Sequence, residues 1–238
     1  MKFNKVLCIT LLFGGLLLSE VMMAQKRYQI GVCDWMVLKR QKLGEFKLAR
    51  ELGCDGLEMA RLFRHTADSL EIKVGAVAMS GFYGQSFAAK QSWKWLVEDC
   101  LNTMQTMQAK VAFLPLGGCG KDWTENTAIR KEIVFRLHEA GEMAAKRGMV
   151  IGIDTPLDAK ENKKLLKEID SPGIKIFYKF QTAVENKRDI SKDLRKLGAD
   201  NICGIHASNT DGVWLRHDKA INMPEIKATL DKLGWSGW

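Results

Sequence analysis

The sequence predicts an α/β protein, specifically a (β/α)8 TIM barrel that lacks its last strand and helix. Three observations lead to this fold class. Seven short apolar runs recur along the chain and alternate with six helical patterns, which favours a parallel sheet. No glycine-rich dinucleotide fingerprint follows the first run, and no shift in composition divides the chain into two domains. The sequence stops at Gly234–Trp238, where an eighth strand should begin.

The predicted strands are short apolar runs, and the predicted helices have apolar residues at helical spacing. The strands cover residues 28–33, 55–59, 72–79, 110–116, 149–153, 173–178 and 202–205. The helices cover residues 41–52, 92–107, 124–147, 158–169, 190–197 and 223–233. Thr124 is the predicted N-cap of the third helix, and Gly148 follows its end.

The N-terminal residues differ from the rest of the chain. Lys2 and Lys5 precede the apolar run Val6–Leu18, and the sequence Met22–Gln25 ends the segment with a small residue before a polar one. This pattern predicts a secretory signal peptide over residues 1–24 and a barrel domain over residues 25–238. The apolar run is short for a membrane span, so we expect no stable span after cleavage; an uncleaved anchor is the alternative. The protein is therefore expected to be exported to the periplasm.

The charge and the cysteine content limit which functions the chain is expected to have. The formal net charge is +8, but the basic residues are spread over predicted helix faces such as 160–167 and 187–196. We interpret this as a solvated basic surface and predict no nucleic-acid partner. Among the six cysteines, Cys33 and Cys203 lie in apolar strand-like runs, where a thiol behaves as a small hydrophobic group.

Candidate functional residues lie where the predicted strands end, because the loops that follow open on one face of a parallel barrel. Glu58, Asp154 and His206 occupy three such positions. Two carboxylates and an imidazole that converge from separate strands would suit a divalent metal ion, or would serve as general acid and base beside a carbonyl. Each has a structural alternative: His206 as a core histidine bonded to backbone, Glu58 paired with a nearby lysine or arginine, and Asp154 as a cap for the next turn.

Five short stretches carry a family resemblance through their order along the chain. They are residues 30–35 (IGVCDW), 53–58 (GCDGLE), 151–155 (IGIDT), 204–209 (GIHASN) and 234–238 (GWSGW). In these stretches the chain resembles the sugar phosphate isomerase/epimerase superfamily, the xylose isomerase-like TIM barrels. More narrowly, it is similar to exported Bacteroidetes-type members of unknown substrate, here truncated before strand eight. The resemblance extends over nearly everything after the signal peptide.

The resemblance implies a metal site at the strand ends. The family takes ligands from strands five to eight, which makes Asp154 and His206 the expected ligands of Mn²⁺, Mg²⁺ or Zn²⁺, with Asp154 and Glu58 as the expected catalytic groups. Lys179 stands where the family places a ligand, and its ammonium would repel a divalent ion. Asn209 replaces a frequent acidic residue, and the strand-eight glutamate is absent. In this form the metal is expected to bind weakly or not at all.

The expected function is that of a sugar (phosphate) isomerase or epimerase, which moves a proton next to a sugar carbonyl with the help of a divalent metal. The expected substrate-binding residues, for a small sugar or sugar derivative, are Trp35, Tyr83, Lys179 and Asn209. The alternatives are a non-catalytic carbohydrate-binding barrel, with Lys179 as the local cation, and an inactive gene fragment. A DNA-repair endonuclease is disfavoured because the chain has only four histidines. Open edges on strands one and seven would favour a homodimer or poor solubility.

Overall fold

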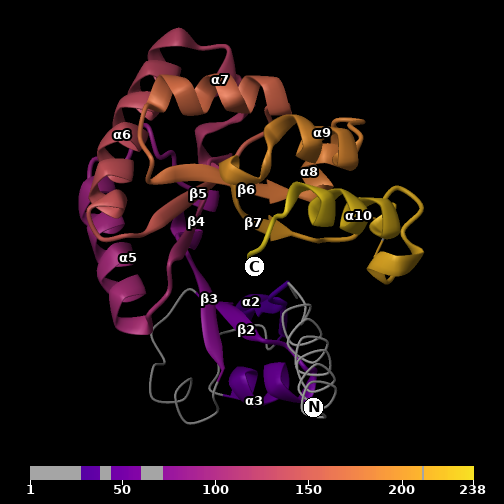
Figure 1. Cartoon of the computed structure of the whole chain (residues 1–238). Helices are drawn as coiled ribbons and strands as arrows, with labels where there is room; N and C mark the ends of the chain where they lie inside the picture. The colour runs from indigo at the N-terminus through magenta and orange to yellow at the C-terminus, as the bar shows by residue number, and fades with distance from the viewer. Residues whose placement is uncertain (1–27, 38–43, 60–71, 211) are drawn as a thin grey trace, which may run out of the picture.

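The computed structural model describes residues 28–37, 44–59, 72–210 and 212–238, so the predicted signal peptide lies outside the described residues. Seven parallel strands form one sheet in the order of the sequence (Figure 1). They are β1 (Gly31–Cys33), β2 (Gly56–Met59), β3 (Lys73–Ala78), β4 (Val111–Pro115), β5 (Val150–Asp154), β6 (Ile174–Lys179) and β7 (Ile202–His206). All seven lie within or beside the predicted runs, and the sheet has the strand order of a barrel that lacks its last strand.

Helices follow most of the strands and cover the outside of the sheet (Figure 1). They are α2 (Asp34–Val37), α3 (Gly44–Glu51), α5 (Trp93–Met107), α6 (Thr127–Ala145), α7 (Ala159–Ile169), α8 (Phe180–Glu185), α9 (Ile190–Leu197) and α10 (Met223–Leu233). The sequence prediction missed two of these, α2 and α8, which are short and begin directly after β1 and β6. No helix among the described residues is long and apolar enough to cross a membrane.

The start of α6 corrects one prediction. Thr124 lies in a short 3-10 turn, and Asn126 is the N-cap instead. The Asn126 side chain accepts hydrogen bonds from the backbone N–H groups of Ala128 and Ile129, both at 3.1 Å. An asparagine at this position satisfies two of the backbone donors that a helix start leaves open, which explains why the helix begins there.

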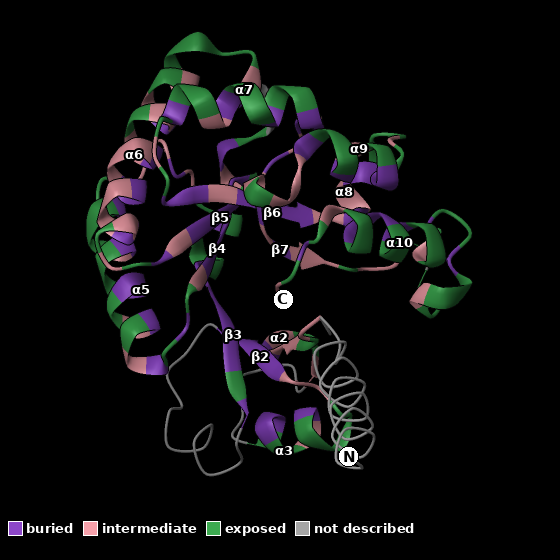
Figure 2. Ribbon diagram, viewed as in Figure 1, coloured by how far each residue is buried: buried purple, intermediate pink, exposed green. Residues whose placement is uncertain are grey.

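The core has an outer layer between helices and sheet and a smaller inner cluster inside the sheet's curve. Helix α6 shows how the outer layer forms, because Ile133, Leu137, Ala140 and Ala144 recur at helical spacing and are all fully buried. In Figure 2 the strands are mostly buried, while the outer faces of α5, α6 and α7 are largely exposed. The inner cluster consists of Ala76, Ala78, Phe113 and Phe177, with Trp35, Val111 and Cys203 packed against it.

The C-terminal tail lies between the two edges of the sheet. The backbone N–H of Ile205 in β7 donates to Trp238 O at 2.9 Å, and the N–H of Gln29, just before β1, donates to Gly237 O at 3.1 Å. The tail thus pairs with both edge segments, where the sequence had suggested open edges. The C-terminus lies close to β7 and β2 in Figure 1.

The Trp238 indole fills the N-terminal end of the barrel interior. It packs over Gly31, Gly56 and Gly75, one glycine from each of β1, β2 and β3. A Cβ atom at Gly56 would lie 2.7 Å from the indole ring, and one at Gly75 would lie 2.6 Å from it. These three glycines therefore provide the space for one large aromatic side chain.

Candidate active site

The register of the strands brings the predicted site residues to one face. Cys33 lies opposite Glu58 in the β1–β2 pair, and Lys179 lies opposite His206 in the β6–β7 pair. Asp154 is the last residue of β5, opposite Pro115 at the end of β4. Because parallel strands all end on the same face, these side chains gather at the C-terminal end of the barrel.

The shortest contact in the site joins Glu58 and His206, from β2 and β7. Glu58 Oε2 lies 2.6 Å from His206 Nε2, although the two residues are 148 positions apart in the sequence. Glu58 is only 7% exposed. Among the residues that the structure describes, the partner of this buried carboxylate is an imidazole and not a lysine or arginine, and the imidazole contacts a carboxylate and not the backbone. Such a pair can share or exchange a proton.

Two aromatic rings hold the His206 side chain in place. The centroids of Phe113 and Phe177 lie 4.6 Å and 4.4 Å from the centroid of the imidazole. Gly204 precedes His206 by two positions on the same face of β7, and a Cβ there would lie 2.6 Å from the Phe177 ring. The glycine lets Phe177 pack close to the strand, and Phe177 in turn restricts the rotation of the imidazole.

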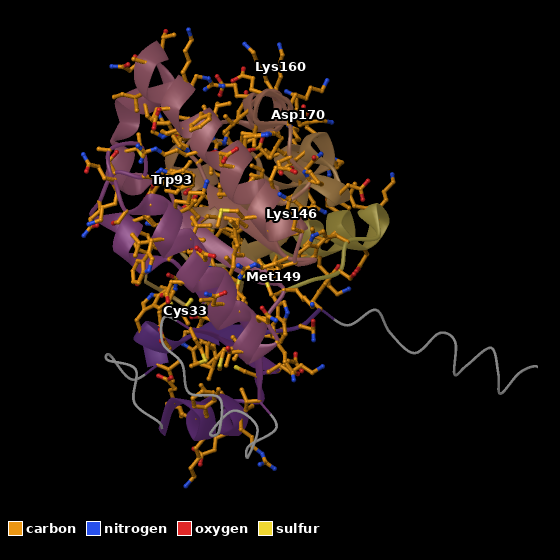
Figure 3. The ribbon with its side chains drawn as sticks, turned by 90° about the vertical axis from the view of Figure 1, so that its left-hand side faces the viewer. Cys33, Trp93, Lys146, Met149, Lys160 and Asp170 are labelled. Carbon is orange, nitrogen blue, oxygen red and sulfur yellow. The ribbon has the colours of Figure 1, made fainter. Side chains whose placement is uncertain are left out.

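Cys33 is a site residue that sequence reasoning did not select. Its thiol donates a hydrogen bond to Glu58 Oε2 at 3.6 Å, and Cys33 Sγ, Glu58 Oε2 and His206 Nε2 all lie within 4.8 Å of one another. Figure 3 shows Cys33 on the indigo N-terminal segment, close to where that segment meets the rest of the chain. Burial, and then the nearby charge of Glu58, raise the pKa of this thiol. The sequence feature that could have identified Cys33 is its position, since Cys33 ends β1 in the same way that His206 ends β7.

Asp154 and Lys179 form the second part of the site, at the ends of β5 and β6. Burial raises the pKa of Asp154, although the positive charges of Lys179 and His206 act in the opposite direction. The turn after β5 is held by Thr155, whose Oγ1 accepts a hydrogen bond from Leu157 N at 3.3 Å. Thr155 therefore has the capping role that was the structural alternative for Asp154. A carboxyl group with a raised pKa is well suited to proton transfer near neutral pH.

Of the remaining predicted residues, Tyr83 and Trp35 pack near the site or the inner cluster, whereas Asn209 forms its contact within a loop. Tyr83 lies in a 3-10 turn after β3, and its ring centroid is 6.0 Å from that of Phe113. Burial, and then the charges of Glu58 and Asp154, raise the pKa of the Tyr83 phenol, which places it in the field of the site. Trp35 packs on the inner cluster. Asn209 instead donates to Val213 O within the loop that follows β7.

The donor atoms in the site can be compared with those of a divalent metal site. Glu58 Oε1 is buried and has no hydrogen-bond partner among the residues that the structure describes, so a ligand atom is free next to Cys33 and His206. Thiolate, carboxylate and imidazole are all metal ligands in proteins. The expected pair of Asp154 and His206 fits less well, because Lys179 already places a positive charge near Asp154.

A match to a protein family shows to which proteins the chain is related. Residues 46–238 match the family described as xylose isomerase-like TIM barrel. The chain belongs to this family. The resemblance to the xylose isomerase-like TIM barrels is thereby confirmed. Among curated protein sequences, no relative matches the chain.

Solved structures show that this xylose isomerase-like chain shares its fold with proteins of several kinds. A structure described as AP endonuclease, family 2, from Brucella melitensis has a TM-score of 0.75 at 14% identity, with 89% of this chain and 91% of that chain covered. An L-ribulose 3-epimerase has a TM-score of 0.74 at 14% identity, covering 89% and 80%. The 3-keto-D-glucoside 4-epimerase from E. coli has a TM-score of 0.72 at 14% identity, covering 89% and 90%. At these identities the likeness shows the fold alone.

Proposed function

We propose that the chain is an isomerase or epimerase that moves a proton next to the carbonyl of a sugar or sugar derivative. The observation that carries this proposal is the Glu58–His206 contact of 2.6 Å, at the same end of the barrel as a second carboxyl group with a raised pKa, Asp154. The family supports the proposal, as do the epimerases among proteins of similar fold.

Two carboxyl groups on separate strands suit the chemistry of this reaction. One removes the proton from the carbon next to the carbonyl, which leaves an enediolate, and the other returns a proton to that carbon or its neighbour. Glu58 lies 2.6 Å from the His206 imidazole, which can receive and return its proton, so we assign Glu58 the role of the base. Asp154, whose pKa is raised, holds a proton more readily and acts as the acid. The roles exchange in the reverse direction.

Positive charge near the carbonyl oxygen stabilises the enediolate. Lys179 ends β6, where its positive charge acts on Asp154, and we assign its ammonium group to this oxygen. A divalent ion bound in the same site would polarise the carbonyl as a Lewis acid. Trp35 lies in helix α2 directly after β1, and Tyr83 lies in the 3-10 turn that follows β3. Both side chains present aromatic surface on which the apolar face of a sugar can stack.

The predicted signal peptide adds a location to this proposal. Export to the periplasm, read from residues 1–24, would give the protein access to free sugars and their derivatives rather than to a DNA substrate. A homodimer is part of the same proposal. Fractionation of cells that produce the full chain, with N-terminal sequencing of the recovered protein, tests the location and the cleavage after Ala24.

The test of the proposed function is exchange of solvent deuterium into sugars. The purified full chain is incubated in D₂O with a panel of aldoses and ketoses, with and without Mn²⁺, Mg²⁺ or Zn²⁺, and deuterium at carbon is followed by NMR. We expect incorporation next to the carbonyl of at least one sugar. Glu58→Gln and Asp154→Asn should each reduce the rate by about 100-fold or more. Asp200→Asn, an exposed carboxylate in the turn before β7, is the matched control and should leave the rate unchanged.

A second function is favoured by one specific observation, the positive charge of Lys179 beside Asp154. This charge could make the barrel a carbohydrate-binding protein that does not catalyse. In that case calorimetry would detect binding of a sugar, Lys179→Met would weaken it, and no deuterium would enter the bound sugar. Exchange that depends on both Glu58 and Asp154 would exclude this second function.

A further inference from the structure

We propose that Cys33, Glu58 and His206 form a zinc site on the β1–β2–β7 side of the barrel. This site differs from the metal position expected from the resemblance, which uses Asp154 on β5 and has Lys179 beside it. As a cofactor site for catalysis the inference rests on the proposed function, whereas zinc binding itself does not.

One distance between the ligand atoms already has the value expected for a zinc site, and a second needs a small adjustment. In a tetrahedral site with Zn–S of about 2.3 Å and Zn–N or Zn–O of about 2.1 Å, sulfur and oxygen lie about 3.6 Å apart and nitrogen and oxygen about 3.4 Å apart. The Cys33 Sγ–Glu58 Oε2 distance is 3.6 Å. The His206 Nε2–Glu58 Oε2 distance is 2.6 Å, so this pair must separate by about 0.8 Å. A small change in the side-chain torsions of Glu58, which moves Oε2 away from the imidazole, achieves this separation.

The state of Glu58 is the second, independent observation. Its side chain is more than nine-tenths buried, and Oε1 has no hydrogen-bond partner within the described part of the chain. A buried carboxylate oxygen without a partner is costly, and a bound cation removes that cost. A mixed thiolate, imidazole and carboxylate set favours zinc over Mg²⁺, which prefers oxygen ligands alone.

The surroundings of the three residues fit a zinc ion that also binds a substrate. Three protein ligands leave the fourth tetrahedral position open, as in catalytic zinc sites. Phe113 and Phe177 pack on the His206 ring and limit its rotation, so Nε2 stays directed towards Glu58. On the other side, Asp154 and Lys179 remain available for proton transfer and for the substrate oxygen. In this arrangement the zinc ion would hold Glu58 in place for its proposed role as base, and Asp154 and Lys179 would act from the other side.

Cobalt substitution tests this assignment through a signal specific to the thiolate. The full chain is treated with a chelator and titrated with Co²⁺ while the absorption spectrum is recorded. We expect one equivalent of Co²⁺ per chain, an intense visible spectrum typical of tetrahedral cobalt and a thiolate-to-cobalt charge-transfer band in the near ultraviolet. One equivalent of Zn²⁺ should remove both signals.

Variants separate the proposed ligands from their neighbours. Cys33→Ser should abolish the charge-transfer band, and Glu58→Gln and His206→Asn should weaken Co²⁺ binding on the order of 100-fold. Cys54→Ser changes a cysteine outside the site and should keep the full spectrum. Circular dichroism of each variant confirms that a lost band does not come from a lost fold.

Three results would overturn the zinc site: no binding of Co²⁺ to the folded chain, binding without a charge-transfer band, or binding that Asp154→Asn abolishes and Cys33→Ser does not. These results are distinct from a failure of the proposed function. Deuterium exchange without the band would remove the zinc site and keep the isomerase. The band without exchange would keep the zinc site and remove the isomerase.

Discussion

The two ends of the barrel interior are filled in opposite ways. At the N-terminal end, the apolar indole of Trp238 packs over Gly31, Gly56 and Gly75. At the C-terminal end, polar groups face one another, with Glu58 and His206 in direct contact at 2.6 Å. Burying an apolar ring stabilises the fold, whereas burying a carboxylate opposes it. The comparison indicates that the first end serves stability and the second end serves chemistry, as is general for this kind of barrel.

The largest expected effect is on activity, at the C-terminal end. Glu58→Gln removes the proposed base but keeps the size of the side chain, so deuterium exchange should fall about 10²–10⁴-fold. The free energy of unfolding, measured by urea denaturation, should be unchanged or higher, because a buried carboxylate has been replaced by a neutral amide. A large loss of stability in this variant would contradict the division between the two ends.

The next effect is on stability, at the N-terminal end. Trp238→Ala empties the space over the three glycines and should lower the free energy of unfolding by about 3 kcal/mol. The exchange rate per folded molecule should change little. Trp214→Ala is the matched control, since this tryptophan is 71% exposed and should alter stability by less than about 0.5 kcal/mol. Equal effects of the two substitutions in urea denaturation would show that Trp238 does not support the fold.

A related substitution adds volume at the same end. Gly75→Ala places a methyl group 2.6 Å from the Trp238 ring, so either the ring or the strand must move. We expect a loss of about 1–3 kcal/mol in the free energy of unfolding. The double variant with Trp238→Ala should recover part of this loss, because the clash no longer exists. A fully additive double-mutant cycle would mean that the two residues do not interact.

The pH dependence of stability tests whether the buried Asp154 carboxylate at the C-terminal end destabilises the fold. The pKa of Asp154 is raised above the ordinary value of 3.8, so the folded state favours the protonated carboxyl. Its contribution to stability is fully present below pH 3.8 and is lost as pH rises through the folded-state pKa. Asp154→Asn should therefore be more stable than the natural chain near neutral pH and similar to it at low pH. Thermal melts across this range check the sign, and the reverse order would be inconsistent with a raised pKa.

The smallest expected effect concerns Tyr83, which is 47% exposed at the mouth of the site. Tyr83→Phe keeps the ring for stacking and removes one hydroxyl, so the exchange rate should fall by less than about tenfold. Unfolding should be unaffected. Because the hydroxyl would contact the substrate rather than the fold, steady-state kinetics should show the loss in KM or kcat. A drop as large as that of Glu58→Gln would place Tyr83 among the groups that transfer protons.

Much of the fold could be predicted from local patterns, and the exceptions have local causes. The strands that formed from the apolar runs differ in length, since β3 through β7 have five or six residues each, β1 has three and β2 has four. Helices α2 and α8 were missed because each has at most six residues, too few for a helical period to show. Thr124 was preferred as the α6 cap although Asn126, two residues later, has the side chain that caps.

The candidate site was predictable only in part. Glu58, Asp154 and His206 were selected because they end strands, and the register confirms that they reach one face. That Glu58 meets His206 was not predictable, because a residue's partner across 148 positions depends on how the sheet curves. Cys33 was not selected because it ends an apolar strand-like run, and the same thiol suits a core or a metal site.

The sequence by itself determined the alternation of strands and helices, and with it the parallel sheet and the face on which polar residues gather. These properties depend on the periods of strands and helices, which are local. Only the tertiary structure decided that Trp238 lies over three glycines and that Cys33, Glu58 and His206 lie within 4.8 Å of one another. Such contacts join residues far apart in the chain, and they arise only when the sheet curves and its edges approach.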